Sequence, residues 1–125
     1  MKRQVLRAWL LLLFVDCILH VRGFNALYMV VREQKPFARK RAVAPSIETL
    51  VVAMDYACVF YFKSVLCLQR SAATTLQLRR QGHSAEMVIG TSLIPFKSHA
   101  WVEIGTNIVN DKPYVRDIYQ ALERC

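Results

Sequence analysis

The two halves of the chain carry different hydrophobic patterns, and this change restricts the fold more than any other feature. Up to about residue 81 the apolar residues recur at helical spacing, whereas residues 99–104 alternate as a half-buried strand does. The patterns predict helices at residues 4–22, 25–34, 47–61, 65–81 and 114–124, and strands at 87–89, 99–104 and 108–111. Helices followed by a small antiparallel sheet and a C-terminal helix indicate an α+β fold.

Glycine, proline and serine mark the predicted boundaries. Gly23 and Gly82 each follow the last residues of a predicted helix, where a left-handed residue is favoured. Ser46 and Ser64 precede helices and are the expected N-caps. Residues 34–45 hold two prolines and four basic residues, which is typical of a loop.

The length and composition favour one folded domain covering residues 1–125. A chain of 125 residues can bury one modest core, and an apolar fraction of 54% argues against disorder. We expect a helical, basic N-terminal region at residues 1–45 and the core of the fold at residues 46–125.

The net charge of +8 is concentrated in the N-terminal third. Residues 1–42 carry nine Lys and Arg against two acidic residues, whereas residues 43–125 carry eight against seven. A partner of this third would be acidic, although a solvated basic surface explains the charge equally well. Nucleic-acid binding is not expected, because the basic residues are not interleaved with aromatic ones.

The N-terminus imitates a signal peptide without completing one. Basic residues precede an apolar run at residues 8–19, but Asp16 interrupts the run and no small-residue cleavage site follows. Twelve residues are too few to span a bilayer, which needs about 20. We expect a core or interface helix here, and peripheral membrane contact stays open.

The four cysteines favour reduced thiols in a cytoplasmic protein. Cys17, Cys58, Cys67 and Cys125 have long, irregular spacings and form no CxxC pair, which argues against a zinc ribbon or a disulfide scaffold. Cys17 and His20 would supply two ligands, which are too few to hold a metal. We expect no metal and no cofactor; Cys58 fits a core position.

Cys67, His99 and Asp111 have the chemistry of a catalytic triad. Cys67 lies in the first turn of a predicted helix, whose N-terminus favours a thiolate. His99 begins one predicted strand and Asp111 ends the next. A three-residue turn at 105–107 would place Asp111 diagonally across from His99 on the same face of the sheet. A two-residue turn would place the Asp111 side chain on the opposite face. The triad therefore predicts the longer turn.

Several sequence motifs around these residues occur in the order found in a known family. They are Cys67-Leu-Gln-Arg-Ser71, Leu78-Arg-Arg-Gln-Gly82, Ala85-Glu-Met-Val-Ile-Gly90, Pro95-Phe-Lys-Ser-His-Ala-Trp-Val-Glu103 and Val109-Asn-Asp111. From about residue 64 to residue 112 the chain resembles the leader peptidases of lasso-peptide biosynthesis, the transglutaminase-like half of the lasso B protein. His83 departs from the pattern, which favours an apolar residue after Gly82.

The resemblance implies a papain/transglutaminase-like fold, with residues 46–125 as the catalytic core. It implies a cysteine peptidase that removes the leader from a ribosomally made lasso-peptide precursor. The chain is similar to the split form of the family, which acts with a separate leader-recognition protein and a macrolactam cyclase. No substrate-binding residue is assigned.

The residue roles follow from the triad. Cys67 attacks the scissile carbonyl, His99 transfers the proton, and Asp111 orients His99. The backbone N–H of Cys67 is one expected oxyanion donor, with Gln69 a candidate for the second. Arg70 and Ser71 are expected to serve helix packing.

Trp101 either covers the imidazole or simply packs in the core.

Two other functions stay open for the chain as a whole. One is a transglutaminase-type acyltransferase, which uses the same triad. The other is a non-catalytic peptide-binding adaptor of the same fold.

Overall fold

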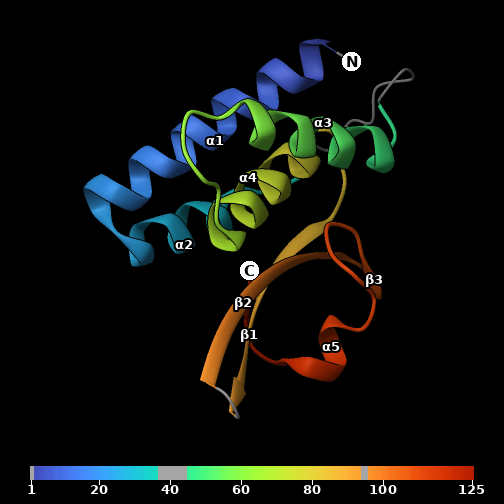
Figure 1. The fold of residues 1–125 in the computed structure, drawn as a ribbon. Coiled ribbons are helices and arrows are strands. Elements are labelled where there is room, and N and C mark those ends of the chain that lie inside the picture. The colour runs from blue at the N-terminus through green and yellow to red at the C-terminus, as the bar shows by residue number, and fades with distance from the viewer. Residues whose placement is uncertain (1, 37–44, 94–95) are drawn as a thin grey trace.

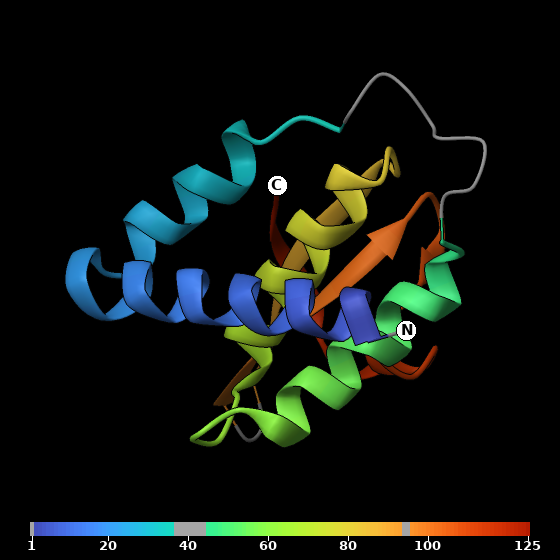
Figure 2. The same cartoon turned by 90° about the horizontal axis from the view of Figure 1, so that it is seen from above.

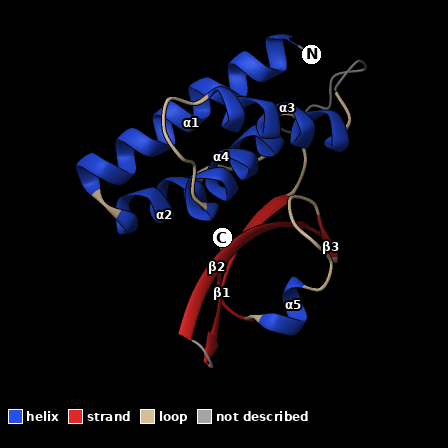
Figure 3. Cartoon of the chain, in the orientation of Figure 1, coloured by secondary structure: helices blue, strands red, loops and turns tan. Residues whose placement is uncertain are grey.

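The computed structural model describes residues 2–36, 45–93 and 96–125 and has two layers. Four helices form one layer, and a four-stranded antiparallel sheet in the order β3-β2-β1-β4 forms the other (Figures 1 and 3). The helices are α1 (Lys2–Arg22), α2 (Phe24–Glu33), α3 (Ile47–Phe60) and α4 (Cys67–Arg80). The strands are β1 (Ala85–Leu93), β2 (Phe96–Ile104), β3 (Asn107–Ile108) and β4 (Gln120–Arg124). The predicted order, helices followed by an antiparallel sheet, is confirmed.

Helix α4 lies at the centre of the fold. It packs against α1, α2 and α3 on one side and against β1 and β2 on the other. Every residue from Ser71 to Arg79 is buried, and Ser71 to Thr75 are all small. Small side chains let both layers approach the α4 backbone closely, and the main core forms around them from residues such as Leu12, Leu27, Met54 and Met87.

The predicted boundaries of α1 to α4 lie within two residues of the observed ones, but the N-cap predicted for α4 is wrong. Gly23 follows α1 with φ +88°, and the Ser46 side chain accepts a hydrogen bond from the Thr49 N–H. Ser64 does not cap α4, because the helix begins three residues later, after Leu66. The Leu66 N–H donates to the Gln69 side-chain oxygen, which reaches back over the first turn. Most of the predicted loop at residues 34–45, with Arg39, Lys40 and Arg41, lies outside the described residues.

The predicted C-terminal helix at residues 114–124 is wrong. Only α5 (Val115–Ile118) is helical, and β4 then pairs antiparallel with β1. The backbone of Cys125 extends this pairing through reciprocal hydrogen bonds with Met87. The free edge of β1 offers a row of backbone partners, and this tertiary pairing overrides the helical preference of the segment.

The turn between β2 and β3 is shorter than predicted. Ile104 pairs with Asn107, so the turn has two residues, Gly105 and Thr106. Gly105 has φ +61°, the left-handed conformation that tight hairpin turns need. The three-residue turn that the triad predicted is therefore wrong.

Helix α1 has two residues more than the helix predicted at residues 4–22, and it extends beyond the apolar run at residues 8–19 on both sides. It has 21 residues and contains an 18-residue window with a mean hydropathy of 1.7, so its length and composition would allow it to cross a membrane. Only 28% of its apolar window is buried inside the molecule. The apolar run at residues 8–19 is too short to span a bilayer by itself, whereas the helix that contains it is long enough. One face of α1, with Leu12 and Val15, nevertheless belongs to the main core.

Gly90 leaves room for the Trp101 ring beside strand β1. A Cβ atom at position 90 would stand 2.6 Å from Trp101 Cη2 and 2.9 Å from the Gln120 carbonyl oxygen. A β-bulge between Ile89 and Gly90 shifts the register with β4 at the same point. No side chain fits here unless the ring or the strand moves.

We predict that Gly90→Ala lowers the free energy of unfolding by about 1–3 kcal/mol, because overpacking forces Trp101 or β4 to shift. Urea denaturation measures this change. The matched control is Gly105→Asn, since asparagine tolerates a positive φ and a Cβ at Gly105 meets nothing within 4 Å. Equal losses in the two variants would contradict the proposed clash.

Candidate functional site

The structure brings His99 and Asp111 together. His99 Nε2 lies 2.5 Å from Asp111 Oδ2, and the two side chains are 25% and 27% exposed. The contact is reached by a different route from the predicted one, because β3 ends at Ile108 and the chain bends at residues 109–111. This bend returns Asp111 to the face of His99, which the short turn would otherwise have prevented.

Asn110 holds the bend in place. Its side-chain oxygen accepts a hydrogen bond of 2.7 Å from the Val102 N–H, and its amide donates to Ser71 Oγ at 3.1 Å. Ser71 Oγ in turn donates to the Ala100 carbonyl at 3.0 Å. Helix α4, strand β2 and the loop before Asp111 are thus linked by one buried side-chain network. Sequence reasoning assigned Asn110 no role, although the residue stands inside a recognised motif.

Cys67 is the first residue of α4 and is half-buried. Ser71 lies one helical turn further on the same face and contacts Ala100, the neighbour of His99. The face of α4 that carries Cys67 therefore meets β2 beside His99. Within the described part of the chain, no hydrogen bond joins Cys67 to His99 or Asp111. Because Asp111 occupies Nε2, Nδ1 is the ring nitrogen left for a thiol.

Two of the other cysteines are poor nucleophiles in this structure. Burial raises the pKa of Cys58, and it raises the pKa of Cys125 to about 11, so both thiols stay protonated at neutral pH. Cys17 is exposed on α1, and all four cysteines are free. Cys67 is the cysteine that begins a helix.

Two aromatic rings flank His99. The Trp101 ring centroid is 6.1 Å from that of His99, and the Tyr119 centroid is 5.1 Å away. Trp101 is 1% exposed, so it both packs in the core and covers the imidazole. Sequence reasoning missed Tyr119, because the residue was placed in a helix that does not form. It precedes β4, whose pairing with β1 brings the ring to His99.

A buried carboxylate fixes the C-terminal segment against the sheet. Glu103 is 3% exposed and accepts hydrogen bonds from Trp101 Nε1 at 2.7 Å, Arg116 Nε at 3.3 Å and Arg124 at 3.0 Å. Burial alone would raise the pKa of Glu103, but these donors hold it below its ordinary value. Arg124 also contacts Glu86, which pairs with Glu103 across the strands, so it separates two opposed negative charges.

A second buried carboxylate supports the start of α4. Asp16 of α1 is 5% exposed and contacts Tyr61 at 3.0 Å and Lys63 at 2.9 Å. The Gln69 amide nitrogen donates to Asp16 at 3.5 Å, while its oxygen accepts from Leu66. Both ends of Gln69 therefore hold the first turn of α4, which leaves its amide turned away from an oxyanion role. Arg70 pairs with Asp55 of α3.

The side chains around Asp16, which we call the Asp16 cluster, shift the pKa values of both Asp16 and Tyr61. Burial opposes ionisation of Asp16, but hydrogen bonds from Lys63, Tyr61 and Gln69 keep its pKa below the ordinary value. Burial, and then the hydrogen bond to Asp16, raise the pKa of Tyr61 to about 12. Among the described residues, no group of three or more His, Cys, Asp or Glu side chains could hold a metal ion.

Comparisons with known proteins give a family match and a curated relative. Residues 10–124 match a family described as the transglutaminase-like superfamily. The microcin J25-processing protein McjB of Escherichia coli is 43% identical over 51 residues. That match covers 41% of this chain and 24% of the relative, so the chain matches about a quarter of the curated protein's length. No solved structure gives a significant match.

The Asp16 cluster predicts an acid-sensitive part of the stability. A lowered folded-state pKa means that Asp16 stabilises the fold fully above its ordinary pKa of 3.8, and that this stabilisation is lost as the pH falls through the folded-state pKa. We expect Asp16→Asn to lower the free energy of unfolding by about 2 kcal/mol at pH 7, with the difference shrinking below about pH 4.

Urea denaturation from pH 7 to pH 3 measures this difference. The control is Asp55→Asn, which removes the negative charge from an ion pair whose acid is 50% exposed. We expect a change below about 1 kcal/mol there. A pH-independent loss in Asp16→Asn would show that Asp16 acts through packing alone.

Proposed function

Because the chain belongs to the transglutaminase-like superfamily, we propose that it is a cysteine peptidase with Cys67, His99 and Asp111 as its catalytic triad. The observation that carries this proposal is the 2.5 Å contact between His99 and Asp111. His99 lies on β2, the strand against which α4 packs. A carboxylate on Nε2 fixes the imidazole tautomer and leaves Nδ1 to serve the thiol. Cys67 begins α4, on the face that also carries Ser71, and Ser71 contacts the residue beside His99.

The proposed reaction proceeds in two steps. The Cys67 thiolate attacks the scissile carbonyl to form an acyl-enzyme, and His99 donates a proton to the leaving amine. A water molecule that gives a proton to His99 then attacks the acyl-enzyme carbonyl. The thioester bond breaks, the second product leaves with a new carboxyl group, and Cys67 returns to the thiolate beside protonated His99. Asp111 stabilises the imidazolium in both steps. The backbone N–H of Cys67 is a suitable donor to the oxyanion, because the first N–H groups of a helix have no partner within that helix.

Trp101 and Tyr119 give the imidazole an apolar setting. Both rings lie within 6.1 Å of the His99 ring, centroid to centroid. Such cover limits the access of water to His99 and strengthens its interaction with Asp111. Glu103 holds this cover in place through Trp101, Arg116 and Arg124.

We propose that the substrate is the leader segment of a ribosomally made lasso-peptide precursor. The support is the similarity to a protein named for processing microcin J25, together with the sequence motifs around the triad. A separate leader-recognition protein and a macrolactam cyclase are the proposed partners, in a cytoplasmic setting. The acyltransferase alternative differs only in the second step, where an amine in place of water accepts the acyl group.

Mass spectrometry of a precursor peptide tests the proposal. The peptide, encoded near this gene, is incubated with the protein and its recognition partner. We expect a single cut at the leader–core junction, loss of cleavage in Cys67→Ala, and at least about a hundredfold slower cleavage in His99→Ala and Asp111→Asn. Cys17→Ala is the matched control, since it removes an exposed thiol from α1.

The products separate the alternatives. A mass increase from a transferred amine would indicate the acyltransferase. Tight binding of an uncut peptide by both the wild type and Cys67→Ala would indicate the adaptor and reject the peptidase.

Asn110 is predicted to position Asp111. Asn110→Ala leaves the Val102 N–H without its partner and releases the bend before Asp111. We expect kcat to fall by at least about tenfold, with KM changed by less than about threefold. Thr106→Ala, in the neighbouring exposed turn, is the control. A loss confined to KM would reject the positioning role.

A further inference from the structure

Helix α1 has two apolar faces, and its outer face is not covered within the described structure. Its inner face, with residues such as Leu12, is buried in the core. On the outer face Leu6, Leu10, Phe14 and Val21 are 60%, 51%, 46% and 81% exposed. Their spacing of four, four and seven residues places them in one stripe along the helix. In Figures 1 and 2, α1 lies on the side of the helical layer that is turned away from the sheet.

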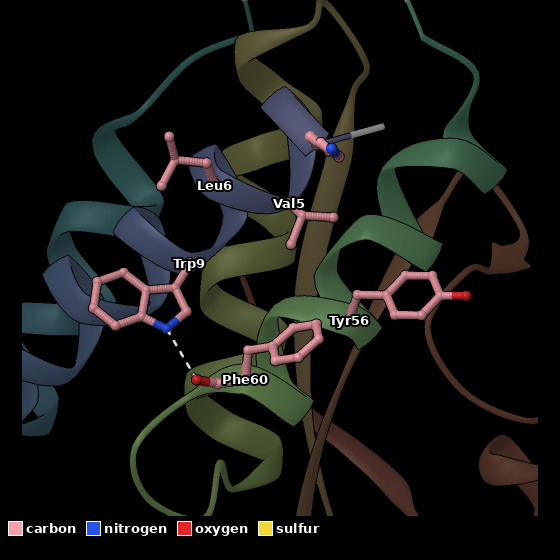
Figure 4. Close-up of a pocket in the computed structure, with 6 residues that line it drawn as sticks. Val5, Leu6, Trp9, Tyr56 and Phe60 are labelled. Carbon is pink, nitrogen blue, oxygen red and sulfur yellow. Dashed lines mark hydrogen bonds between the residues drawn. The ribbon is translucent and has the colours of Figure 1, made fainter.

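The stripe continues into an apolar groove between α1 and α3. Leu6 and Trp9 form one wall and Tyr56 and Phe60 the other, around a volume of about 450 Å³ with Lys2 at its edge (Figure 4). Tyr56 is 52% exposed and Phe60 is 70% exposed. Trp9 anchors the groove through a 3.4 Å hydrogen bond to the Phe60 carbonyl. Monomeric proteins rarely leave a continuous apolar surface of this kind open to water.

The charges on α1 have one sign wherever the helix is exposed. The acid of this helix, Asp16, is buried and paired. Its basic residues stand at the two ends of the helix and are exposed, namely Lys2, Arg3, Arg7 and Arg22. On α3, Asp55 is neutralised by Arg70, while Glu48 lies in the first turn, away from the groove residues. The apolar stripe is therefore flanked at both ends by positive charge.

We propose that this face, the α1 stripe together with its groove, binds an anionic lipid surface with α1 lying in the plane of the bilayer. A straight apolar stripe on a helix about 30 Å long fits a flat acyl boundary. Basic residues at its ends match anionic headgroups. Trp9 and Tyr56 are of the kind that gathers at a membrane–water interface. The buried inner face keeps α1 from crossing the bilayer without unfolding the core.

This orientation leaves the candidate site accessible. Cys67 and His99 lie where α4 meets β2, and α1 packs on the other side of α4. A bilayer against the outer face of α1 would leave the sheet and the site in water. The inference does not depend on the peptidase proposal, and a vesicle-binding experiment tests it separately from cleavage.

Vesicle co-sedimentation with the full chain tests the proposal. The probes are phosphatidylcholine vesicles and phosphatidylcholine vesicles containing phosphatidylglycerol. We expect binding to the anionic vesicles to be at least about tenfold stronger than to the neutral ones, and weaker at high salt, because the basic residues are exposed. A protein that stays in the supernatant with both kinds of vesicle would overturn the proposal and point to a protein partner for the face.

Two pairs of substitutions locate the binding surface. Leu6→Gln with Leu10→Gln should weaken vesicle binding by about tenfold or more, because both side chains lose their apolar contact with the bilayer. The control is Ile118→Gln with Leu122→Gln, two residues on α5 and β4 that are 53% and 61% exposed. All four positions are exposed, so the fold is expected to survive, and circular dichroism checks this. Equal loss of binding in the two pairs would overturn the assignment to α1.

Discussion

The hydrogen bond from Ser71 to the Ala100 carbonyl joins the helical layer to the sheet at the point where the chemistry is concentrated. It sets the height of α4 over β2 and therefore the position of Cys67 relative to His99. Asn110 adds a second connection from the same hydroxyl to the loop that carries Asp111. One small buried side chain thus fixes three segments that are far apart in the sequence. The run of small residues in α4 is what permits such a close approach.

Two buried carboxylates extend this framework in opposite directions. Asp16 of α1 forms hydrogen bonds with the loop after α3 and with the first turn of α4. Glu103 of β2 forms hydrogen bonds with α5 and with β4. Each is held ionised by several donors, and a buried charge with one missing partner is costly. The two clusters therefore favour a single arrangement of the segments around them. Both act on the site indirectly, one through the helix that bears the thiol and the other through the rings beside the imidazole.

Local sequence signals predicted much of the fold and failed where tertiary contacts decide the structure. Gly23 and Ser46 mark helix ends by their own backbone and side-chain chemistry, so these boundaries were predictable. The apolar residues of the segment at 114–124 have helical spacing, but the second half of this segment pairs with the edge of β1 as strand β4. Tyr119 was missed for that reason.

The site shows the same division between local and tertiary signals. His99 and Asp111 were proposed as neighbours, and they are in contact, but the turn length used to argue for this was wrong. The bend at Asn110 depends on Ser71 in another layer, which no pattern near residue 110 reveals. Likewise, the Leu66–Gln69 contact displaced the cap expected at Ser64.

The absence of a side chain at Gly90 has a consequence for how related sequences can diverge. The indole of Trp101 occupies the space that a Cβ at residue 90 would need, and the strand on the other side leaves no room to retreat. The two positions are therefore free to change only together, a larger residue at one requiring a smaller ring at the other. Among homologues, we expect this pair to covary, and a lineage that lost the tryptophan would be released from the glycine as well.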